Sequence, residues 1–413
     1  MSEHDILPQP KKRLALFFDG TWNLPGSHTD VWRAKLMLAE RGADGIEQRS
    51  FYDEGVGTRW WNRISGGAFG AGLSENIRDG YRWLMENYDY GDEIYVFGFS
   101  RGAFTARSLV GLIAKCGLLK ADAPIGFEQI FGRYEKGKDA RPIYKIKYAA
   151  RRGETISDFE EKGLLNHTHY HPHLVRMIGV WDTVGTIGIN IGTIKGISTG
   201  AMKFHNTHLS TVVQHSYQAL ALDEHRGPFW AILWTQFVPD IPDKVDLSHH
   251  DKRFIEQRWF AGAHANVGGG YRNDLMPQRP LAWIQEKAIT CGLAFRNKVG
   301  TDNEDFQFPV IDSYADFLGG IWKIFKSPYI RWVQSDPVRR GQGWVKTVNE
   351  RIDRSVFERC QKDKNYRPLS LIEWAKRKEQ NLEEIITSPD RYLNLWSDVK
   401  APGIEPLDNH QKP

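Results

Sequence analysis

A serine between two glycines is the residue of this chain whose surroundings best suit catalysis. Gly98-Phe99-Ser100-Arg101-Gly102 has the G-x-S-x-G spacing, in which a serine lies on a tight turn between a strand and a helix. The apolar residues 94–97 before it predict a strand, and the small residues in 103–113 after it predict a helix. We therefore expect Ser100 to be a nucleophile at the carboxyl end of a sheet. The alternative is an ordinary Gly/Ser turn.

A serine hydroxyl becomes a good nucleophile when a base takes its proton and an acid orients that base. Asp182 follows the apolar stretch 174–181, and His264 follows the apolar stretch 258–262 after one further residue. The order Ser, Asp, His along the chain is that of α/β-hydrolases. We expect Asp182 to be the acid and His264 the base. The alternatives are a turn or helix cap for Asp182 and an ordinary loop histidine for His264.

Negative charge that develops on a substrate oxygen requires amide donors close by. The backbone N–H of Arg101, directly after the serine, is one expected donor to this oxyanion hole. Gly20 or Thr21, after a strand predicted at 14–18, is expected to supply the second, although a structural turn would explain the glycine equally well. Further residues beside these positions, or in the apolar segment 183–210, are expected to bind substrate: Asp19, Phe99, Thr183, Ile187 and Ile189.

Strand and helix patterns alternate along the first 300 residues, which predicts an α/β fold with a mostly parallel sheet flanked by helices. Catalytic side chains of such folds lie at the carboxyl ends of the strands. Besides the segments already mentioned, strands are predicted at 49–52 and 229–234, and helices at 30–41 and 74–87.

Residues 13–300 are expected to form one catalytic domain. Insertions at about 120–173 and 183–210 are expected to form a lid and rim. Residues 301–413 are expected to be a helical and aromatic segment packed on the same domain.

Composition restricts the class of protein. The net charge is +4 over 413 residues, which does not indicate a nucleic-acid partner. Three cysteines lie far apart, as suits a reducing compartment, and they predict no structural zinc. The polar amino terminus has no signal-peptide pattern, and no run of eighteen apolar residues occurs. We expect a cytoplasmic product as synthesised, and export by a signal-less route stays open.

Four weaker patterns have more than one interpretation. Alternating histidines at 167–173 suggest metal ligands, but a polar insertion loop is favoured, and no metal or cofactor is expected. The glycine-rich residues 66–72 lack a nucleotide-loop spacing and are expected to shape a loop near the site. Asp223 and Glu224 could supply another acid, but they precede a predicted strand, so a salt-bridged structural role is favoured. Residues 313–342 alternate aromatic and basic side chains, which suits either core packing or transient contact with a membrane surface.

Six motifs occur in one order along the chain and together resemble a known family. They are Phe18-Asp-Gly-Thr-Trp-Asn23, Tyr52-Asp-Glu-Gly-Val-Gly57, Gly98-Phe-Ser-Arg-Gly-Ala103, Val180-Trp-Asp-Thr-Val-Gly185, Ala221-Leu-Asp-Glu-His-Arg226 and Gly262-Ala-His-Ala-Asn-Val-Gly-Gly-Gly-Tyr271. The chain looks like the catalytic domain of the type VI secretion phospholipase effectors of family one, α/β-hydrolases of bacteria that are also found in fungi. The resemblance covers about residues 13–290. It implies hydrolysis of glycerophospholipid acyl esters, with Ser100, Asp182 and His264 as the triad.

The chain departs from the family pattern at one loop, where Ala265-Asn266 replaces the usual Ser-Asp after the motif histidine. The resemblance also makes a secretion machinery and an immunity protein candidate partners, which no residue of the chain itself indicates. Two other functions stay open on the same residues. One is hydrolysis of small esters or other acyl compounds, and the other is a catalytically idle binding module.

Overall fold

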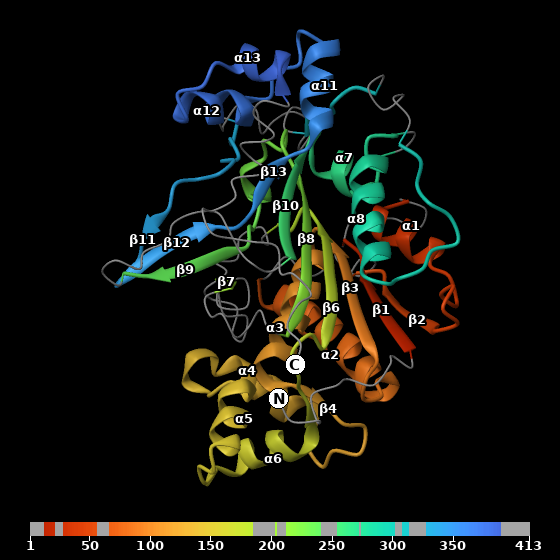
Figure 1. The fold of residues 1–413 in the computed structure, drawn as a ribbon, viewed down its shortest axis with the longest axis vertical. Helices are drawn as coiled ribbons and strands as arrows, with labels where there is room; N and C mark the ends of the chain where they lie inside the picture. The colour runs from red at the N-terminus through yellow and green to blue at the C-terminus, as the bar shows by residue number, and fades with distance from the viewer. Residues whose placement is uncertain are drawn as a thin grey trace, which may run out of the picture.

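The computed structural model describes most of the chain, namely residues 12–20, 28–55, 66–184, 203–204, 212–240, 254–271, 274–301, 308–313 and 328–389. Seven strands form the central sheet, and every neighbouring pair in it is parallel. In spatial order they are β13 (Glu350–Ile352), β10 (Phe254–Phe260), β8 (Val213–Ala221), β6 (Val175–Trp181), β3 (Glu93–Phe99), β1 (Lys12–Phe18) and β2 (Glu47–Asp53). Figure 1 shows helices on both sides of this sheet. The predicted fold class, an α/β-hydrolase fold, is confirmed.

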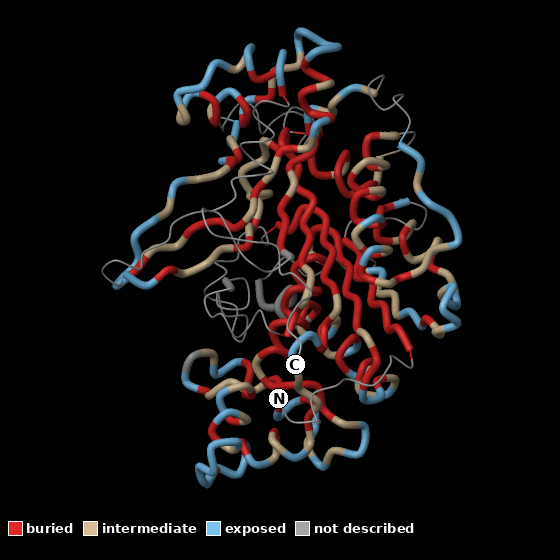
Figure 2. The backbone as a smooth tube through the Cα atoms, viewed as in Figure 1, coloured by how far each residue is buried: buried red, intermediate tan, exposed pale blue. Residues whose placement is uncertain are grey.

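Successive side chains of a strand point to opposite faces of the sheet, and β1 shows how both faces are buried. Leu14, Leu16 and Phe18 pack with helices α2 (Gly66–Asn87) and α3 (Arg101–Cys116) on one face. Ala15 and Phe17 pack with α1 (Asp30–Met37) and α8 (Gln278–Thr290) on the other face. The central strands are buried almost along their whole length (Figure 2). A strand covered on both faces reads as a continuous apolar run, and for this reason β1 and β3 were predictable from the sequence.

The order of the strands fixes where a site can form. From β1 the chain moves to β2 on one side and then to β3 on the other side, so the winding direction reverses between β1 and β3. Open parallel sheets bind ligands in the crevice at the carboxyl ends of the strands at such a reversal. Ser100 follows β3 and Gly20 follows β1. The topology therefore brings the serine turn and the predicted oxyanion loop to the same crevice.

The segment between α3 and β6 forms a small helical layer. It contains the strand pair β4 (Leu118–Leu119) and β5 (Thr168–His169), the short helix η3 (Gly137–Asp139), and the helices α4 (Phe127–Glu135), α5 (Ile143–Arg151) and α6 (Phe159–His167). Because α3 runs back along the sheet from the serine turn and β6 starts from this layer, the layer lies at the amino ends of the strands (Figure 1). We expected the 120–173 insertion to contribute to a lid or rim, yet the chain places it at the opposite end of the sheet from Ser100.

The carboxyl-terminal part of the described chain adds to the same sheet. β13 pairs in parallel with β10, and the helices α11 (Arg354–Lys362), α12 (Leu369–Arg377) and α13 (Leu382–Thr387) pack over this edge. Trp259 of β10 and Leu220 of β8 belong to the apolar cluster beneath these helices. A second sheet, in the order β11 (Val338–Arg339), β12 (Gly343–Thr347), β9 (Thr235–Pro239) and β7 (Lys203–Phe204), extends from this side.

Two predicted elements differ from the structure, and one strand was not predicted. The predicted strand at 229–234 is wrong: the 3-10 helix η5 (Gly227–Phe229) ends in this part, Ala231 forms only an isolated bridge with Val184, and the next strand, β9, begins at Thr235. β8 was missed because its buried residues include Ser216 and Gln218, so it lacks a continuous apolar pattern. Residues 66–72 begin helix α2 and do not form a loop. Within the described part of the chain, no helix combines the length and apolar character needed to cross a bilayer.

Candidate active site

Ser100 occupies a strained turn between β3 and α3. Its backbone angles, φ 57° and ψ −120°, are costly for a residue with a side chain. Its N–H donates to the carbonyl oxygen of Trp181 at 3.0 Å, which ties the turn to the end of β6. A side chain at Gly102 would bring Cβ to 2.1 Å from the carbonyl oxygen of Phe18, and one at Gly98 would bring it to 2.5 Å from that of Gly102. The two glycines are needed because α3 lies directly against β1 and β3.

The imidazole of His264 bridges the predicted nucleophile and acid. His264 Nε2 lies 2.8 Å from Ser100 Oγ, and Nδ1 lies 2.5 Å from Asp182 Oδ2. All three side chains are buried, and Asp182 is fully so. Both separations are within hydrogen-bond reach, and the far ring nitrogen faces the serine as a general base requires. The structure therefore brings together three residues that follow one another along the sequence at intervals of 82 positions.

The carboxylate of Asp182 has cationic and amide partners as well as His264. The guanidinium of Arg331 donates to both carboxylate oxygens, at 2.5 and 3.0 Å, and the N–H of Ala221 donates to Oδ1 at 3.0 Å. Burial alone would raise the pKa of Asp182, but the charge of Arg331 and the contacts with His264 outweigh it and lower the pKa to about 2. The carboxylate is therefore ionised throughout the physiological pH range.

Aromatic rings hold the imidazole in place. The Phe99 ring lies 4.7 Å from the His264 ring at 31°, and the Phe229 ring meets it edge-on at 5.2 Å. Desolvation by burial lowers the pKa of His264 below its ordinary value, and Asp182 only partly offsets this. A neutral imidazole is the form that can accept a proton from Ser100, so this environment favours a base. Phe99, which we predicted to bind substrate, packs against the imidazole.

Hydrogen bonds of Asn266 hold the loop that carries His264, at the position where the family pattern has a carboxylate. Asn266, in the short helix α7 (His264–Gly268), accepts the N–H of Ala263 on its side-chain oxygen at 3.0 Å. Its side-chain nitrogen donates to Asp274 at 2.8 Å, and Asp274 also accepts the N–H of Met276 at 2.9 Å. A carboxylate is therefore present after all, one hydrogen bond further away, and Asn266 connects it to the histidine loop.

The predicted donors to the oxyanion differ in whether their N–H groups are engaged within the protein. The N–H of Arg101 is the first amide of α3, at the positive end of the helix dipole. The N–H of Gly20 donates to the carboxylate of Asp19 at 2.6 Å, so it is engaged within the protein in this state. Asp19 also accepts the hydroxyl protons of Thr29 and Tyr52, at 2.5 and 2.9 Å, which makes it the organiser of the turn after β1. Thr21 lies outside the described residues.

The predicted substrate-binding residues of the 183–210 segment are only partly described. Thr183 is fully buried, and its hydroxyl donates to Gln218 of β8 at 2.5 Å, so it faces the protein interior. Ile187 and Ile189 lie outside the described residues. The lining of an acyl cleft by this segment therefore stays a prediction.

The acidic pair after β8 supports the histidine loop. Asp223 and Glu224 follow a strand, which corrects the expectation that they precede one. Glu224 forms an ion pair with Arg226 at 2.7 Å and accepts the backbone N–H of His264 at 3.3 Å. Asp223 accepts the N–H of Gly262 at 2.7 Å. The favoured interpretation, a salt-bridged structural role, agrees with these contacts.

The alternating histidines lie in the helical layer at the other end of the sheet. His171 Nε2 contacts the hydroxyl of Tyr88 at 3.1 Å, and the ring of His169 packs against the ring of Tyr88. Among the residues that the structure describes, no cluster of three histidine, cysteine or acidic side chains could hold a metal ion.

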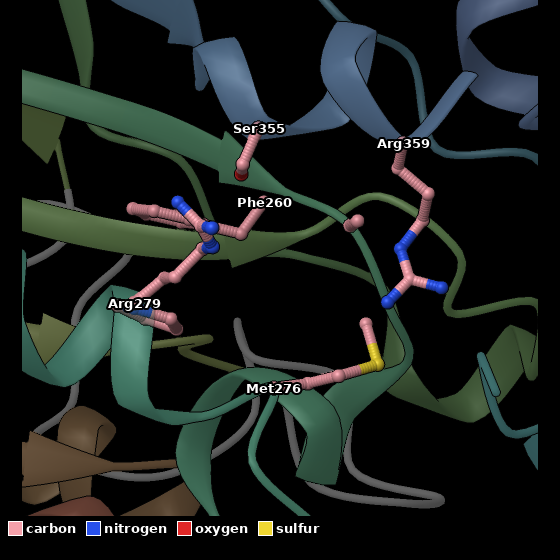
Figure 3. Close-up of a pocket in the computed structure, with 7 residues that line it drawn as sticks. Phe260, Met276, Arg279, Ser355 and Arg359 are labelled. Carbon is pink, nitrogen blue, oxygen red and sulfur yellow. The ribbon is translucent and has the colours of Figure 1, made fainter. Parts of the chain in front are cut away.

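A pocket lies beside the histidine loop, between the end of β10 and the helices α8 and α11 (Figure 3). It is lined by Phe260, Ala261, Met276, Arg279, Pro280, Ser355 and Arg359. Ser100, Asp182 and His264 are not among the residues that line it. The hydroxyl of Ser100 therefore does not open into this pocket.

Arg331 is the residue of the site that the sequence did not reveal. It lies 149 positions after Asp182, beyond the range of the six motifs, within a segment interpreted as either core or membrane-facing. A single buried arginine in an aromatic stretch has no spacing that marks it as a partner of a distant carboxylate.

Comparison with known proteins gives one extensive match. The family model for the catalytic domain of Tle1-like phospholipase effectors of the type VI secretion system matches residues 12–287. An uncharacterised protein of Saccharomyces cerevisiae, YEL023C, is 28% identical over 286 residues, which is 65% of this chain and 39% of that protein. The chain therefore spans well under half the length of this relative.

Two solved structures show looser likeness. The Tle1 effector bound to the VgrG spike is 17% identical, with 67% of this chain and 56% of that chain covered and a TM-score of 0.34. The esterase Est2 of the Planctomycetes species Thermogutta terrifontis is 12% identical, with 70% and 86% covered and a TM-score of 0.32. Scores this low carry no argument, so the relationship rests on the sequence match.

Proposed function

Because the chain belongs to the family of Tle1-like phospholipase effectors of the type VI secretion system and spans its catalytic domain, we propose that it is a serine hydrolase of lipid carboxylic esters. The activity most consistent with the family is of the phospholipase A type, which releases a fatty acid from a glycerophospholipid. The observation that carries the proposal is the contact of His264 with Ser100 at 2.8 Å and with Asp182 at 2.5 Å.

In the proposed reaction, His264 Nε2 takes the proton of Ser100 as Oγ attacks the ester carbonyl carbon. The oxyanion is stabilised by the N–H of Arg101 and the amino end of α3, with Gly20 as a second donor if its amide turns from Asp19 to the substrate. The proton then passes from His264 to the leaving alcohol oxygen as the ester C–O bond breaks. Water, deprotonated by the same imidazole, attacks the acyl-serine; as the bond from the acyl carbon to Oγ breaks, His264 returns the proton to Ser100 and the carboxylic acid leaves.

Asp182 keeps the proton of the neutral imidazole on Nδ1 and stabilises the imidazolium that forms in each step. Its low pKa suits this role, because a protonated acid could do neither. Ser100, His264 and Asp182 should act as a unit. Ser100→Ala, His264→Ala and the double variant are therefore expected to lose ester turnover to about the same extent.

A fluorophosphonate probe tests the nucleophile directly, since it reacts covalently with activated serines. We expect labelling of Ser100, located by peptide mass spectrometry, and loss of labelling in Ser100→Ala. Ser108→Ala is the matched control, because Ser108 lies in the same helix, buried and away from His264. A wild-type protein that is folded but unlabelled would instead be an idle binding module.

Lipid products separate the remaining alternatives. Vesicles of a phosphatidylcholine with two different acyl chains should yield a free fatty acid and a lysophospholipid, and the chain that is released reports the position cleaved. Ser100→Ala serves as the blank. Turnover of acetyl or butyryl esters without any turnover of the phospholipid would favour a small-ester hydrolase on the same residues.

A further inference from the structure

An arginine beyond the family-matched residues contacts the proposed catalytic acid. Arg331 has only 1% of its surface exposed, and its two terminal nitrogens donate to the two carboxylate oxygens of Asp182. This two-pronged geometry is the one in which a guanidinium fixes the plane of a carboxylate. Asp182 Oδ2 has two partners, because it also accepts a hydrogen bond from His264 Nδ1.

The guanidinium is itself anchored on two further parts of the fold. It donates to the carbonyl oxygen of Ala221 at the end of β8, at 2.8 Å, and to that of Phe229 in η5, at 2.5 Å. The ring of Phe229 in turn packs edge-on against the imidazole of His264. Arg331 therefore connects the carboxylate, the strand end beside it and the aromatic wall of the histidine.

Charges around the imidazole are balanced. Asp182 and Glu224 are the anions with the largest effect on the pKa of His264, and each forms an ion pair: Asp182 with Arg331, and Glu224 with Arg226, whose own charge lowers the pKa of His264. With both ion pairs intact, a proton on His264 would add a positive charge that neither pair compensates. Without Arg331 the same proton would neutralise a net negative charge, and imidazolium would be favoured.

We propose that Arg331 is a positioning residue for the reaction: it fixes the carboxylate of Asp182 and balances its charge, so that His264 stays neutral and ready to accept the proton of Ser100. This inference rests on the proposed function. It assigns to a segment outside the family-matched residues 12–287 a direct part in setting the pH range of catalysis.

The test is the pH dependence of kcat/KM for a soluble ester in wild type, Arg331→Gln and Arg331→Lys. Because a base must be neutral, the midpoint of the acid limb follows the pKa of His264 in the free enzyme. We expect Arg331→Gln to shift this midpoint upward by about one pH unit, the effect of one charge removed from a neighbouring pair. Arg331→Lys keeps the charge, so the midpoint should stay while kcat falls about tenfold from lost orientation.

Arg339→Gln is the matched control, since Arg339 is an exposed cation of the same segment that pairs with Asp240. It should leave both kcat and the acid limb unchanged. A merely structural role of Arg331 would lower the melting temperature and the amount of active enzyme without moving the limb, so an unshifted limb in Arg331→Gln overturns the proposal. If Arg331→Gln does not fold, Arg331→Lys decides alone, and wild-type kcat in that variant overturns the orienting role.

Failure of this inference differs from failure of the proposed function. If the wild type neither reacts with the fluorophosphonate nor turns over an ester, the hydrolase proposal fails. If the wild type is active and labelled while Arg331→Gln matches its pH profile, only the role of Arg331 is refuted.

Discussion

Replacing Asp182 with asparagine removes the charge of the proposed acid and keeps its shape. The wild-type carboxylate accepts hydrogen bonds from His264, from both terminal nitrogens of Arg331 and from the N–H of Ala221. Oδ1 accepts from the N–H of Ala221 and from one terminal nitrogen of Arg331, and both groups can only donate, so the oxygen of an asparagine must take this position while its NH2 group replaces Oδ2 beside the second Arg331 nitrogen. Its NH2 group is then left facing His264 Nδ1.

This arrangement reverses the tautomer of the imidazole. Nδ1 has to accept a hydrogen bond from the asparagine, so the ring proton moves to Nε2, where it points at Ser100. An imidazole in this form cannot take the serine proton. Loss of the correct tautomer in a serine triad lowers kcat by about 10⁴-fold, which corresponds to about 5.4 kcal/mol in the activation barrier.

The same change also destabilises the fold. Arg331 would keep its buried charge without a carboxylate, and an ion pair broken in this way costs about 3–5 kcal/mol. Activity should therefore be measured with a soluble ester well below the melting temperature, with circular dichroism on the same samples. Asp353→Asn is the matched control, because Asp353 is a carboxylate that caps α11 and pairs with Arg258 at 3.2 Å rather than with His264 or Arg331.

The measurements distinguish the loss of catalysis from the loss of stability. We expect a loss of kcat of about 10⁴-fold. If Asp182→Asn folds and keeps kcat within about tenfold of wild type, the assignment of Asp182 as the acid is refuted. An equal loss of kcat in Asp353→Asn would show that the assay reports folding and not catalysis.

Three further predictions follow from packing, burial and sequence. Burial lowers the pKa of His264, so the acid limb of kcat/KM should have its midpoint below pH 6.5, the ordinary value for histidine; a midpoint above it would contradict the site electrostatics. Gly102→Ala should lower the melting temperature and activity because its Cβ would lie 2.1 Å from a backbone oxygen, at a cost of about 1–3 kcal/mol, whereas Gly132→Ala in α4 meets no atom within 4 Å and should be harmless. Replacing both Ile187 and Ile189 with Asp should depress hydrolysis of long-chain esters far more than of acetyl esters, because only a long chain draws binding energy from an apolar wall; equal losses would assign the segment to folding.

The local sequence was sufficient to predict the strands that are buried on both faces of the sheet. The residues directly before Ser100 (94–99) and directly before Asp182 (177–181) are continuous apolar runs, and each leads into a polar residue at the carboxyl end of the sheet. Since parallel strands all end at the same edge, the residues after them could be expected to converge without any knowledge of the loops between them.

Sequence reasoning failed where buried polar groups are satisfied by distant partners. Gln218 lies in the middle of β8, fully buried, and bonds to Arg107 of α3 and to Gln257 of β10 as well as to Thr183. A strand that carries such a network does not display the apolar pattern by which strands are recognised. The apolar residues 229–234, in contrast, resemble a strand but form none; Phe229 packs against His264, and the backbone N–H of Trp234 donates to Gln257.

The charge pair between Arg331 and Asp182 bears on where the catalytic unit ends. The family match includes Ser100, Asp182 and His264 but stops at residue 287, before the arginine and before β13. A chain cut at that point would bury Asp182 without its cation and would expose the backbone of β10 as a sheet edge, and both changes are unfavourable. We therefore propose that the described residues 328–389 belong to the same folded unit as the family-matched domain. The acid of the site and the arginine that balances it then depend on one another, because neither charge can remain buried without its partner.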